Sequence, residues 1–422
     1  MTALDVYLHT DLVGRLERLE QARLRFSYGP SWVEKGKGQL SLNLPLRKKA
    51  FGDDECRPFF AGLLPEGGFL KAIARAYHVS ADNPFSVLTE IGGECAGAVS
   101  LVSPEEQPPF LVAAPPSWLG HDEVAGLLAE LPSRPLLAGF DDEEGIRLSL
   151  AGAQDKLPVL ARDSQLGITR GQPPSTHILK RPIPEVDGMV ANEAFCLALA
   201  REVGLTTAEA IPLSAGDEEG LLVTRYDRIR TGDAVHRIHQ EDLCQALGFL
   251  PEQKYESEGG PGVEACATLL REHSAAPAVD LLAFLDALIF NLLIGNADAH
   301  SKNYSLLLGG ERSPRLAPLY DLLSTRVYGR RFGRKMAMKY GGEYRFDRIR
   351  GRHLDRLAAE LGIAPSETRV RANDLQYDVA GSCAAARSRL PTAWQKSDVI
   401  DGIEDVILGA ARQLEVAVAE PA

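Results

Sequence analysis

The sequence has few cysteines, and no two of them form a C-x-x-C motif. The six cysteines are scattered over 422 residues and lie mostly in apolar runs, as reduced thiols of a protein core do. This distribution excludes a disulfide framework. It predicts a reducing, cytoplasmic compartment.

Long apolar segments and an excess of positive charge are also missing. The first twenty residues include acidic side chains and no apolar stretch, so we expect no signal peptide. Residues 279–294 are apolar but contain Asp280 and Asp286 and fall short of the roughly 20 residues of a membrane span, which predicts a core helix. The net charge of -12 disfavours diffuse nucleic-acid binding and favours a basic protein partner.

The composition is that of a globular protein, with 45% hydrophobic and 25% charged residues and no low-complexity tract. The length predicts two or three domains. Shifts in pattern divide the chain into an N-terminal α+β subdomain (1–102), a linker and connecting helix (103–144), a lobe of strands and one long helix (145–248) and a helical lobe (249–422).

The first half of the chain mixes strand and helix patterns. Alternating residues predict a strand at 39–46, and helical spacing predicts helices at 59–76, 122–130 and 189–203. Residues 146–160 predict two strands joined by a small-residue turn, and short apolar runs predict strands at 176–180 and 221–225.

The second half is mainly helical by pattern. Helices are predicted over roughly 269–291, 352–362 and 369–390. The order therefore predicts an α+β fold with two lobes, a mixed N-terminal lobe and a helical C-terminal lobe.

The most informative motif follows the apolar segment and reads GNADAHSKN over 295–303, with Asp321 further on in PLYDLLS. Asp298 and Asn303 match the D-x-x-x-x-N catalytic loop of kinases, in which the aspartate accepts the substrate hydroxyl proton and the asparagine binds Mg²⁺. Asp321 fits a second metal ligand. Such residues also cap turns and helices routinely, so the motif alone does not decide.

The upstream sequence supplies the other parts of a kinase in the required order. A small-residue turn at 149–154 could bring backbone N–H groups to ATP phosphates, although with one glycine it is also an ordinary hairpin turn. Lys180 ends a predicted strand and suits the lysine that contacts the phosphates, and Glu193 on the next helix is its expected ion-pair partner.

Several motifs together carry a family resemblance. The chain resembles the HipA family of serine/threonine kinases in FFAGLLPEG (59–67), IGGECAGAVSL (91–101), SLAGAQDK (149–156), STHILK (175–180), NEAFCLALAREVGL (192–205), LLVTRYDR (221–228), HQEDLCQALG (239–248), GNADAHSKN (295–303), MAMKYGG (336–342) and PLYDLLS (318–324).

The resemblance implies a two-lobed, protein-kinase-like α+β fold with an extra N-terminal subdomain, in which 145–248 is the nucleotide-binding lobe and 249–422 the catalytic lobe. It also implies ATP and Mg²⁺ as cofactors and assigns residue roles. Asp298 is the catalytic aspartate, Asn303 and Asp321 are the metal ligands, and Ser149 is a site of inactivating autophosphorylation. The nucleotide-binding set is Ser149, Ala151, Gly152, Ala153, Gln154, Lys180, Glu193, Thr224, Tyr226, Gln240, His300 and Tyr320, with 224–226 as the hinge that reads adenine.

The resemblance also implies partners. A HipA-like toxin pairs with a helix-turn-helix antitoxin resembling HipB, reaches operator DNA mainly through it, and phosphorylates a protein such as glutamyl-tRNA synthetase or another tRNA synthetase. No membrane partner is expected.

Two alternatives stay open at this point. His300, two residues after Asp298, is also found at that place in aminoglycoside-kinase-like enzymes, which keeps a small-molecule phosphotransferase in consideration. A catalytically idle co-repressor is the second. Asn296 and Ala297 replace the His-Arg of ordinary protein kinases, and Leu322 and Leu323 follow Asp321 where those kinases have Phe-Gly, so no ordinary activation segment is expected.

Overall fold

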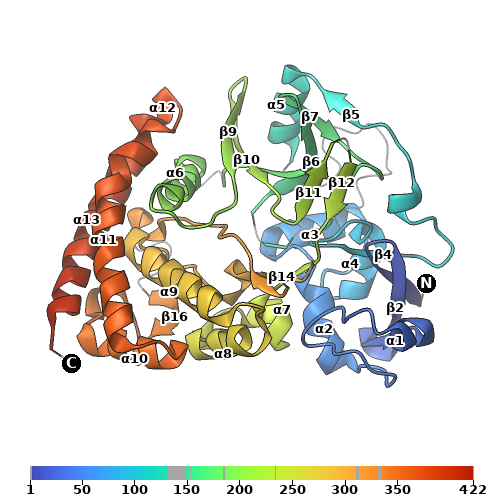
Figure 1. Cartoon of the computed structure of the whole chain (residues 1–422). Coiled ribbons are helices and arrows are strands. Elements are labelled where there is room, and N and C mark those ends of the chain that lie inside the picture. The colour runs from blue at the N-terminus through green and yellow to red at the C-terminus, as the bar shows by residue number, and fades with distance from the viewer. Residues whose placement is uncertain are drawn as a thin grey trace. The chain divides into compact units, whose positions relative to one another are not determined.

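A computed structural model describes residues 2–131, 149, 151–152, 154–183, 186–232, 234–309, 313–329 and 335–421. The chain forms two compact units (Figure 1). Unit 1 comprises Met1–Arg181, Leu213–Pro251 and Leu307–Gly309, and unit 2 comprises Pro182–Pro212, Glu252–Leu306 and Gly310–Ala422.

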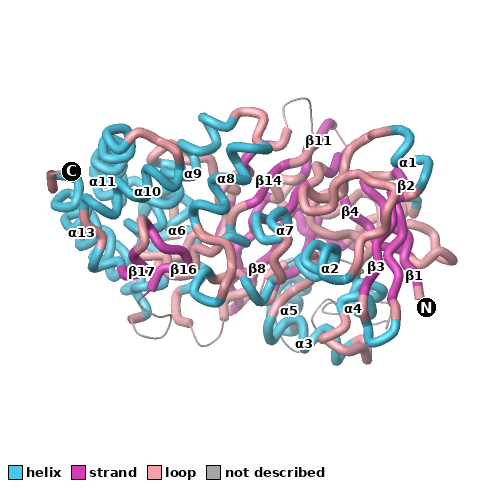
Figure 2. Tube along the Cα trace, turned by 90° about the horizontal axis from the view of Figure 1, so that it is seen from below, coloured by secondary structure: helices cyan, strands magenta, loops and turns pink. Residues whose placement is uncertain are grey.

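The two largest sheets have most of their strands in unit 1. The first has the order β3-β2-β1-β4, and its strands lie side by side in Figure 2. The second has the order β5-β7-β6-β8-β10-β9. The strands are β1 (Ala3–Leu8), β2 (Asp11–Arg18), β3 (Leu24–Tyr28), β4 (Val99–Val102), β5 (Ser117–Leu119), β6 (Lys156–Arg162), β7 (Gln165–Ile168), β8 (His177–Lys180), β9 (Ala210–Ala215), β10 (Glu218–Thr224), the hairpin β11 (Arg228–Thr231) and β12 (Ala234–Arg237), and β13 (Gln240–Asp242).

The helices of unit 1 are short. They are α1 (Pro30–Lys35), α2 (Asp53–Gly62), α3 (Gly67–Ala76), α4 (Pro84–Ile91), α5 (His121–Glu130) and α7 (Leu243–Leu247). Aromatic packing joins α2 to the first sheet, because the ring of Phe60 lies 5.5 Å from that of Phe26 in β3. This contact fixes the segment that follows α2, residues 63–66, which bears on the site below.

Unit 2 is mainly helical. It contains α6 (Met189–Glu202), α8 (Val263–His273), α9 (Pro277–Ile294), α10 (Gly351–Leu361), α11 (Pro365–Ser388), α12 (Thr392–Gln395) and α13 (Asp398–Ala419), with the short strands β14 (Ser305–Leu307), β15 (Arg315–Leu316), β16 (Lys335–Tyr340) and β17 (Glu343–Arg345). Helices α11 and α13 run alongside each other in Figure 1.

Helix α9 is the core of unit 2 and leads into the catalytic motif. It begins at Pro277, whose missing N–H costs nothing in a first turn, and it ends where Gly295 adopts a φ of +69°. Within the described residues it is the one helix long and apolar enough to cross a membrane, and 67% of its most apolar window is buried inside the protein. A buried helix of this kind fits the prediction of a core helix.

The structure confirms the helices predicted at 122–130, 189–203, 352–362 and 369–390 and the strands at 176–180 and 221–225, within a few residues at their ends. Strand β6 is the second strand of the predicted hairpin, whereas residues 146–148 and 150 lie outside the described residues.

Three predictions of regular structure were wrong. Residues 39–46 form no strand, because the Ser41 hydroxyl and the Leu42 N–H donate to the carboxylate of Glu241 at 2.5 and 2.9 Å in place of ladder bonds. The segment 59–76 is two helices, α2 and α3, and 269–291 is also two, since Pro277 starts α9 after a break.

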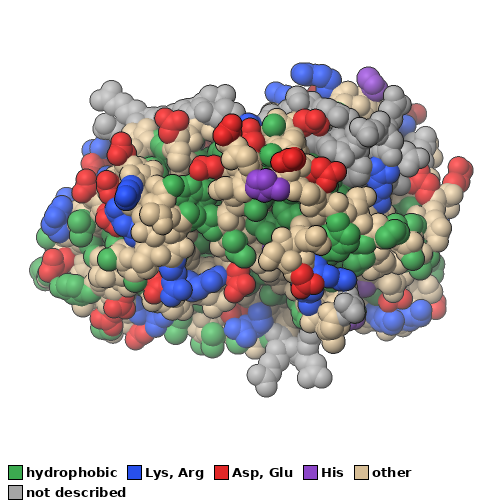
Figure 3. Space-filling view, turned by 90° about the horizontal axis from the view of Figure 1, so that it is seen from above, with side chains coloured by type: hydrophobic (Ala, Val, Ile, Leu, Met, Phe, Trp, Pro, Cys, Tyr) green, Lys and Arg blue, Asp and Glu red, His purple; other side chains and the backbone are tan. Residues whose placement is uncertain are grey.

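The cysteines lie in the protein core, as the sequence predicts. All six cysteines are buried and none forms a disulfide. Acidic and basic side chains are interspersed on the face drawn in Figure 3.

Candidate active site

The main chain of the predicted catalytic loop is held by side chains of unit 2. The Asn296 amide donates to Asn291 at 2.9 Å, and its own oxygen accepts the Asp298 N–H at 3.1 Å. The Ala297 N–H donates to the Thr325 hydroxyl at 2.7 Å. This explains Asn296-Ala297 in place of His-Arg, because the asparagine supplies both a donor and an acceptor to the turn.

Asp298 and Asn303 are brought together as the spacing predicts. The Asn303 amide donates to the Asp298 carbonyl at 3.3 Å, and the His300 N–H donates to the same carbonyl at 2.8 Å. The Asp298 side chain is 52% exposed, so its carboxylate is accessible to a substrate. The His300 ring is buried, with Nε2 4.0 Å from Asp298 Oδ1.

Tyr320 ties the Asp321 segment to this loop. Its hydroxyl donates to the Lys302 carbonyl at 2.8 Å and shares a hydrogen bond with the Ser305 hydroxyl at 2.6 Å, so both residues that flank Asn303 and Tyr304 are held by it. Asn192 of α6 fixes the other side, since its oxygen accepts the Ser324 N–H at 2.8 Å and its amide donates to the Ser324 carbonyl at 3.0 Å.

The backbone of Asp321 is left-handed, with a φ of +52°. This region is uncommon for residues with a side chain, although aspartate tolerates it better than most, and strain of this kind clusters at functional sites. An aspartate therefore occupies a turn in which a glycine would carry a smaller conformational penalty.

The donor set fits Mg²⁺. Asn303 and Asp321 offer an amide and a carboxylate oxygen, which are hard ligands, and Mg²⁺ usually takes only one or two protein groups besides phosphate and water. In the part of the chain that the structure describes, no cluster of three or more His, Cys, Asp or Glu forms a ready metal cage. A magnesium ion here would therefore need oxygens from a nucleotide and from water.

The predicted phosphate loop is packed against the N-terminal subdomain within unit 1. Ser149 is fully buried; its hydroxyl donates to the Leu63 carbonyl at 2.6 Å and its N–H to the Glu94 carbonyl at 2.8 Å. The Gly152 carbonyl accepts the Glu66 N–H at 3.0 Å. Gly152 has a φ of +107°, a backbone conformation that residues with a side chain rarely adopt, which favours glycine at this position.

Two lysines face each other beside this loop. Lys156 of β6 and Lys180 of β8 are directly opposite in the antiparallel ladder, and both are buried. Lys156 donates to the Ala151 carbonyl, and the Gln154 amide donates to the Arg181 carbonyl at 2.6 Å, which holds the loop at the end of β8. Like charges directly opposite each other in a sheet are unfavourable unless other groups compensate them.

The predicted hinge residues are connected to each other. Thr224 ends β10, the Tyr226 hydroxyl donates to the Gln240 oxygen, and the Gln240 amide donates to Asp227 at 3.4 Å. Tyr226 and Gln240 are half-buried. The two side chains therefore form one polar surface at the end of β10.

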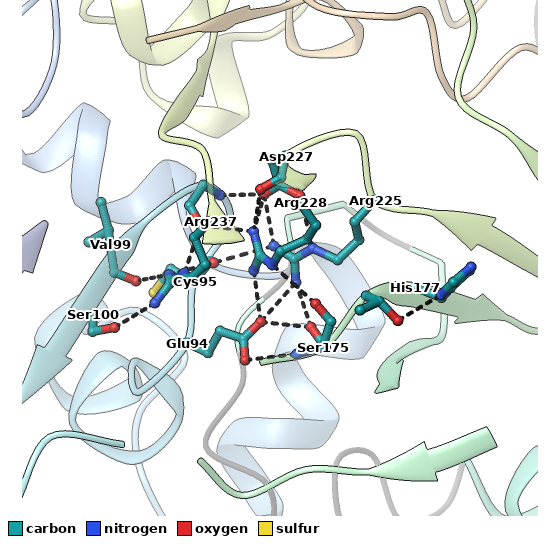
Figure 4. Close-up of polar contacts among 12 residues, drawn as sticks. Glu94, Cys95, Val99, Ser100, Ser175, His177, Arg225, Asp227, Arg228 and Arg237 are labelled. Atoms are coloured by element: carbon teal, nitrogen blue, oxygen red, sulfur yellow. Dashed lines mark hydrogen bonds and ion pairs between the residues drawn. The ribbon is translucent and has the colours of Figure 1, made fainter. Parts of the chain in front are cut away.

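A buried ion network lies directly behind this hinge (Figure 4). Arg225 pairs with Asp227 at 2.9 Å and with Glu94 at 3.3 Å, and Arg228 pairs with the same two carboxylates at 2.9 and 2.8 Å. The Gly97 N–H donates to Asp227 at 2.7 Å. The network thus joins the N-terminal subdomain to the strand that carries the hinge.

Electrostatics keeps these groups charged despite burial. Burial acts to raise the pKa of Asp227 and of Glu94, but the guanidinium charges of Arg225 and Arg228 outweigh it and hold both pKa values below their usual range. Arg237 brings a third guanidinium, and burial together with the charge of Arg228 lowers its pKa to about 10. Three guanidiniums and two carboxylates leave one excess positive charge.

The structure describes all predicted site residues except one. Glu193 is buried on α6 of unit 2, whereas Lys180 belongs to unit 1, and their ion pair stays a prediction. Ala153 lies outside the described residues. Two residues near these motifs were not predicted from the sequence. Lys156 is the last residue of the SLAGAQDK motif, and Tyr255 lies in a polar, glycine-rich segment that contains no motif.

Comparison with known proteins extends over nearly the whole chain. Residues 4–102 match the HipA N-terminal domain and residues 148–383 match the HipA-like C-terminal domain. Y4mE of Sinorhizobium fredii, a protein assigned as a kinase, is 41% identical over 98% of this chain and 99% of its own length. The serine/threonine-protein kinase toxin HipA of Shewanella oneidensis is 30% identical over 80% of this chain and 78% of its own length.

A solved structure from Shewanella oneidensis MR-1, of the toxin–antitoxin system HipA and HipB with its operator DNA, is similar in fold. It superposes with a TM-score of 0.84 at 25% identity and covers 99% of this chain and 100% of that one. This similarity confirms the predicted two-lobed, kinase-like α+β fold.

Proposed function

This chain belongs to the HipA family of kinases, and from that premise we propose that it is an ATP- and Mg²⁺-dependent serine/threonine-protein kinase that serves as the toxin of a toxin–antitoxin pair. The observation that carries the proposal is the loop of Asp298 and Asn303, with Asp321 tied to it through Tyr320. Transfer of labelled phosphate from ATP to a protein, in the presence of Mg²⁺ and host lysate, tests it.

Unit 1 supplies the nucleotide-binding residues in this proposal. Lys180 and Lys156 neutralise phosphate charge, and the open backbone at Gly152 lets N–H groups approach the phosphates. The main chain of 224–226 reads the adenine edge, while Tyr226, oriented by Gln240, lies against the base.

Unit 2 supplies the residues of phosphoryl transfer. Asp298 accepts the proton of the acceptor hydroxyl as the bond from that oxygen to the γ-phosphorus forms and the bond to the ADP oxygen breaks. Asn303 and Asp321 would hold Mg²⁺, which supplies charge neutralisation at the phosphates when it is bound. The exposed Asp298 carboxylate suits a serine or threonine on a protein surface.

The left-handed turn at Asp321 yields a prediction that separates stability from activity. Asp321→Gly should leave the free energy of unfolding unchanged or raise it by up to about 1 kcal/mol, since glycine carries no penalty at a φ of +52°. Kinase activity at saturating Mg²⁺ should fall roughly 100-fold with the lost ligand. Thermal unfolding and a phosphate-transfer assay measure the two quantities; a less stable but active variant would contradict the assignment.

We also propose that Ser149 is the autophosphorylation site that switches the enzyme off. Its hydroxyl is a donor in a fully buried position, where a phosphoserine of about -1.5 to -2 charge could neither donate to Leu63 nor fit. Modification would thus force the loop away from Leu63 and Glu94 and remove the phosphate cradle.

Ser149→Ala should retain nucleotide affinity within about threefold, because only one hydrogen bond to Leu63 is lost. The variant should no longer lose activity during prolonged incubation with Mg-ATP, whereas the unmodified chain should. Activity against time and mass spectrometry of the serine follow the effect. Inactivation at an unchanged rate in the variant would refute this role.

The partners follow from the same family. The solved Shewanella oneidensis neighbour is a complex with HipB and operator DNA, and we propose a helix-turn-helix antitoxin as the partner here, with operator DNA bound mainly through it. The net charge of -12 suits a basic partner. We propose a tRNA synthetase, such as glutamyl-tRNA synthetase, as the protein substrate and the cytoplasm as the location, where buried reduced cysteines persist.

A further inference from the structure

Tyr255 contacts the catalytic carboxylate. Its hydroxyl donates to Asp298 Oδ1 at 2.5 Å, and its ring packs edge-on against His300 with centroids 5.3 Å apart. Both partners belong to the predicted catalytic loop, and all three residues lie in unit 2. The tyrosine thus meets the reactive loop from a segment, residues 251–262, that the proposed function does not use.

The backbone around Tyr255 is firmly placed. Its carbonyl accepts the N–H groups of Glu258 and Gly260, each at 3.0 Å, which closes a tight turn. The next residue, Glu256, accepts the Lys339 N–H of β16 at 2.6 Å and pairs with the Lys339 ammonium at 3.4 Å. A side chain on so constrained a turn is suited to orienting a partner, since little conformational freedom is lost on contact.

The Asp298 side chain needs such a partner. Its main chain is fixed by Asn296, His300 and Asn303, but its carboxylate is half-exposed, and exposed side chains change rotamer readily. A general base must meet its substrate within hydrogen-bond reach, so rotamer freedom at this carboxylate would lower the fraction of productive encounters.

Resting on the proposed kinase function, we propose that Tyr255 is a positioning residue of the phosphoryl-transfer reaction. Its hydroxyl anchors Oδ1 of Asp298 and leaves Oδ2 to accept the proton of the substrate hydroxyl. His300 in turn buttresses the tyrosine ring, which gives this histidine a role within the protein in place of a small-molecule contact.

In the alternative role, the Tyr255 hydroxyl would compete with the substrate hydroxyl for the Asp298 carboxylate. A hydroxyl on the catalytic carboxylate also imitates an acceptor, so a mobile tyrosine would block the protein substrate until displaced. The anchored turn and the Glu256–Lys339 pair favour a fixed tyrosine over a mobile one.

The test compares Tyr255→Phe with a matched control in steady-state kinetics. Loss of one hydrogen bond to a charged group should lower kcat by about 10- to 100-fold, with the KM values for Mg-ATP and for the protein substrate changed less than threefold. Tyr377→Phe removes the same kind of bond, from an exposed tyrosine to Glu415 at 3.1 Å, and should leave kcat unchanged.

A crystal structure of Tyr255→Phe gives a second readout that needs no turnover. We expect the ring to remain against His300 and the Asp298 side chain to occupy more than one rotamer. An unchanged kcat, a lower KM for the protein substrate at constant kcat, or a single native rotamer in the variant would each overturn the proposal. If the unmodified chain itself transfers no phosphate, the proposed function fails. The rotamers of Asp298 in the Tyr255→Phe crystal structure still decide whether Tyr255 orients Asp298.

Discussion

Replacing Asp298 by asparagine should lower the rate of phosphate transfer to protein by roughly 1,000-fold, the loss expected on removing a general base. Asparagine keeps an oxygen for the Tyr255 hydroxyl and preserves the main-chain bonds to His300 and Asn303, so only the proton acceptor disappears. Because the side chain is 52% exposed, the unfolding temperature should hardly move. Transfer from labelled ATP measures the rate.

Asp347→Asn is the control for that loss. Asp347 is an exposed aspartate of the same unit that pairs with Arg345 at 3.0 Å, and its loss should change neither activity nor stability appreciably. Full activity of Asp298→Asn would show that another group accepts the proton and would remove the basis of the proposed site.

Glu94→Gln should destabilise the protein more than any other single change considered. It leaves the guanidiniums of Arg225, Arg228 and Arg237 buried with only Asp227 to compensate them, and breaking a buried ion network of this kind costs about 3–5 kcal/mol. A urea titration followed by tryptophan fluorescence, to which Trp32 and Trp118 of unit 1 and Trp394 of unit 2 contribute, gives the free energy of unfolding.

Glu17→Gln provides the contrast. Glu17 binds Arg25 with two hydrogen bonds at 2.9 and 3.1 Å in the same unit, but both side chains are exposed to solvent, and the loss should be about 0–1 kcal/mol. Equal effects of the two substitutions would mean that the network contributes no more than a surface ion pair.

The candidate catalytic residues were the easiest part of the proposed site to locate in the sequence. Asp298, Asn303 and Asp321 are read from a single stretch of sequence because a catalytic loop is local, and the structure joins the first two directly. Helix α6 was equally clear, since apolar spacing and Gly204 mark its extent.

Contacts between segments far apart in the sequence could not be predicted from the sequence. Glu94 meets Arg225 across 131 residues, and Ser41 meets Glu241 across 200, and neither pair leaves a periodic trace in the sequence. Lys156 was not singled out within the SLAGAQDK motif, and the polar, glycine-rich surroundings of Tyr255 carry no motif. Strand β7 and helix α13 were also missed.

The long separation of Glu94 from its arginine partners along the sequence has a consequence for synthesis on the ribosome. The N-terminal subdomain emerges early, but the guanidiniums that neutralise Glu94 belong to residues 225–237, which follow α6 of the other unit. At roughly 5–20 residues per second, the nascent chain waits on the order of 10 s for these partners. The ion network of unit 1 therefore forms late, and its formation closes a large loop of the chain. The partly synthesised chain is thus the form most in need of chaperones.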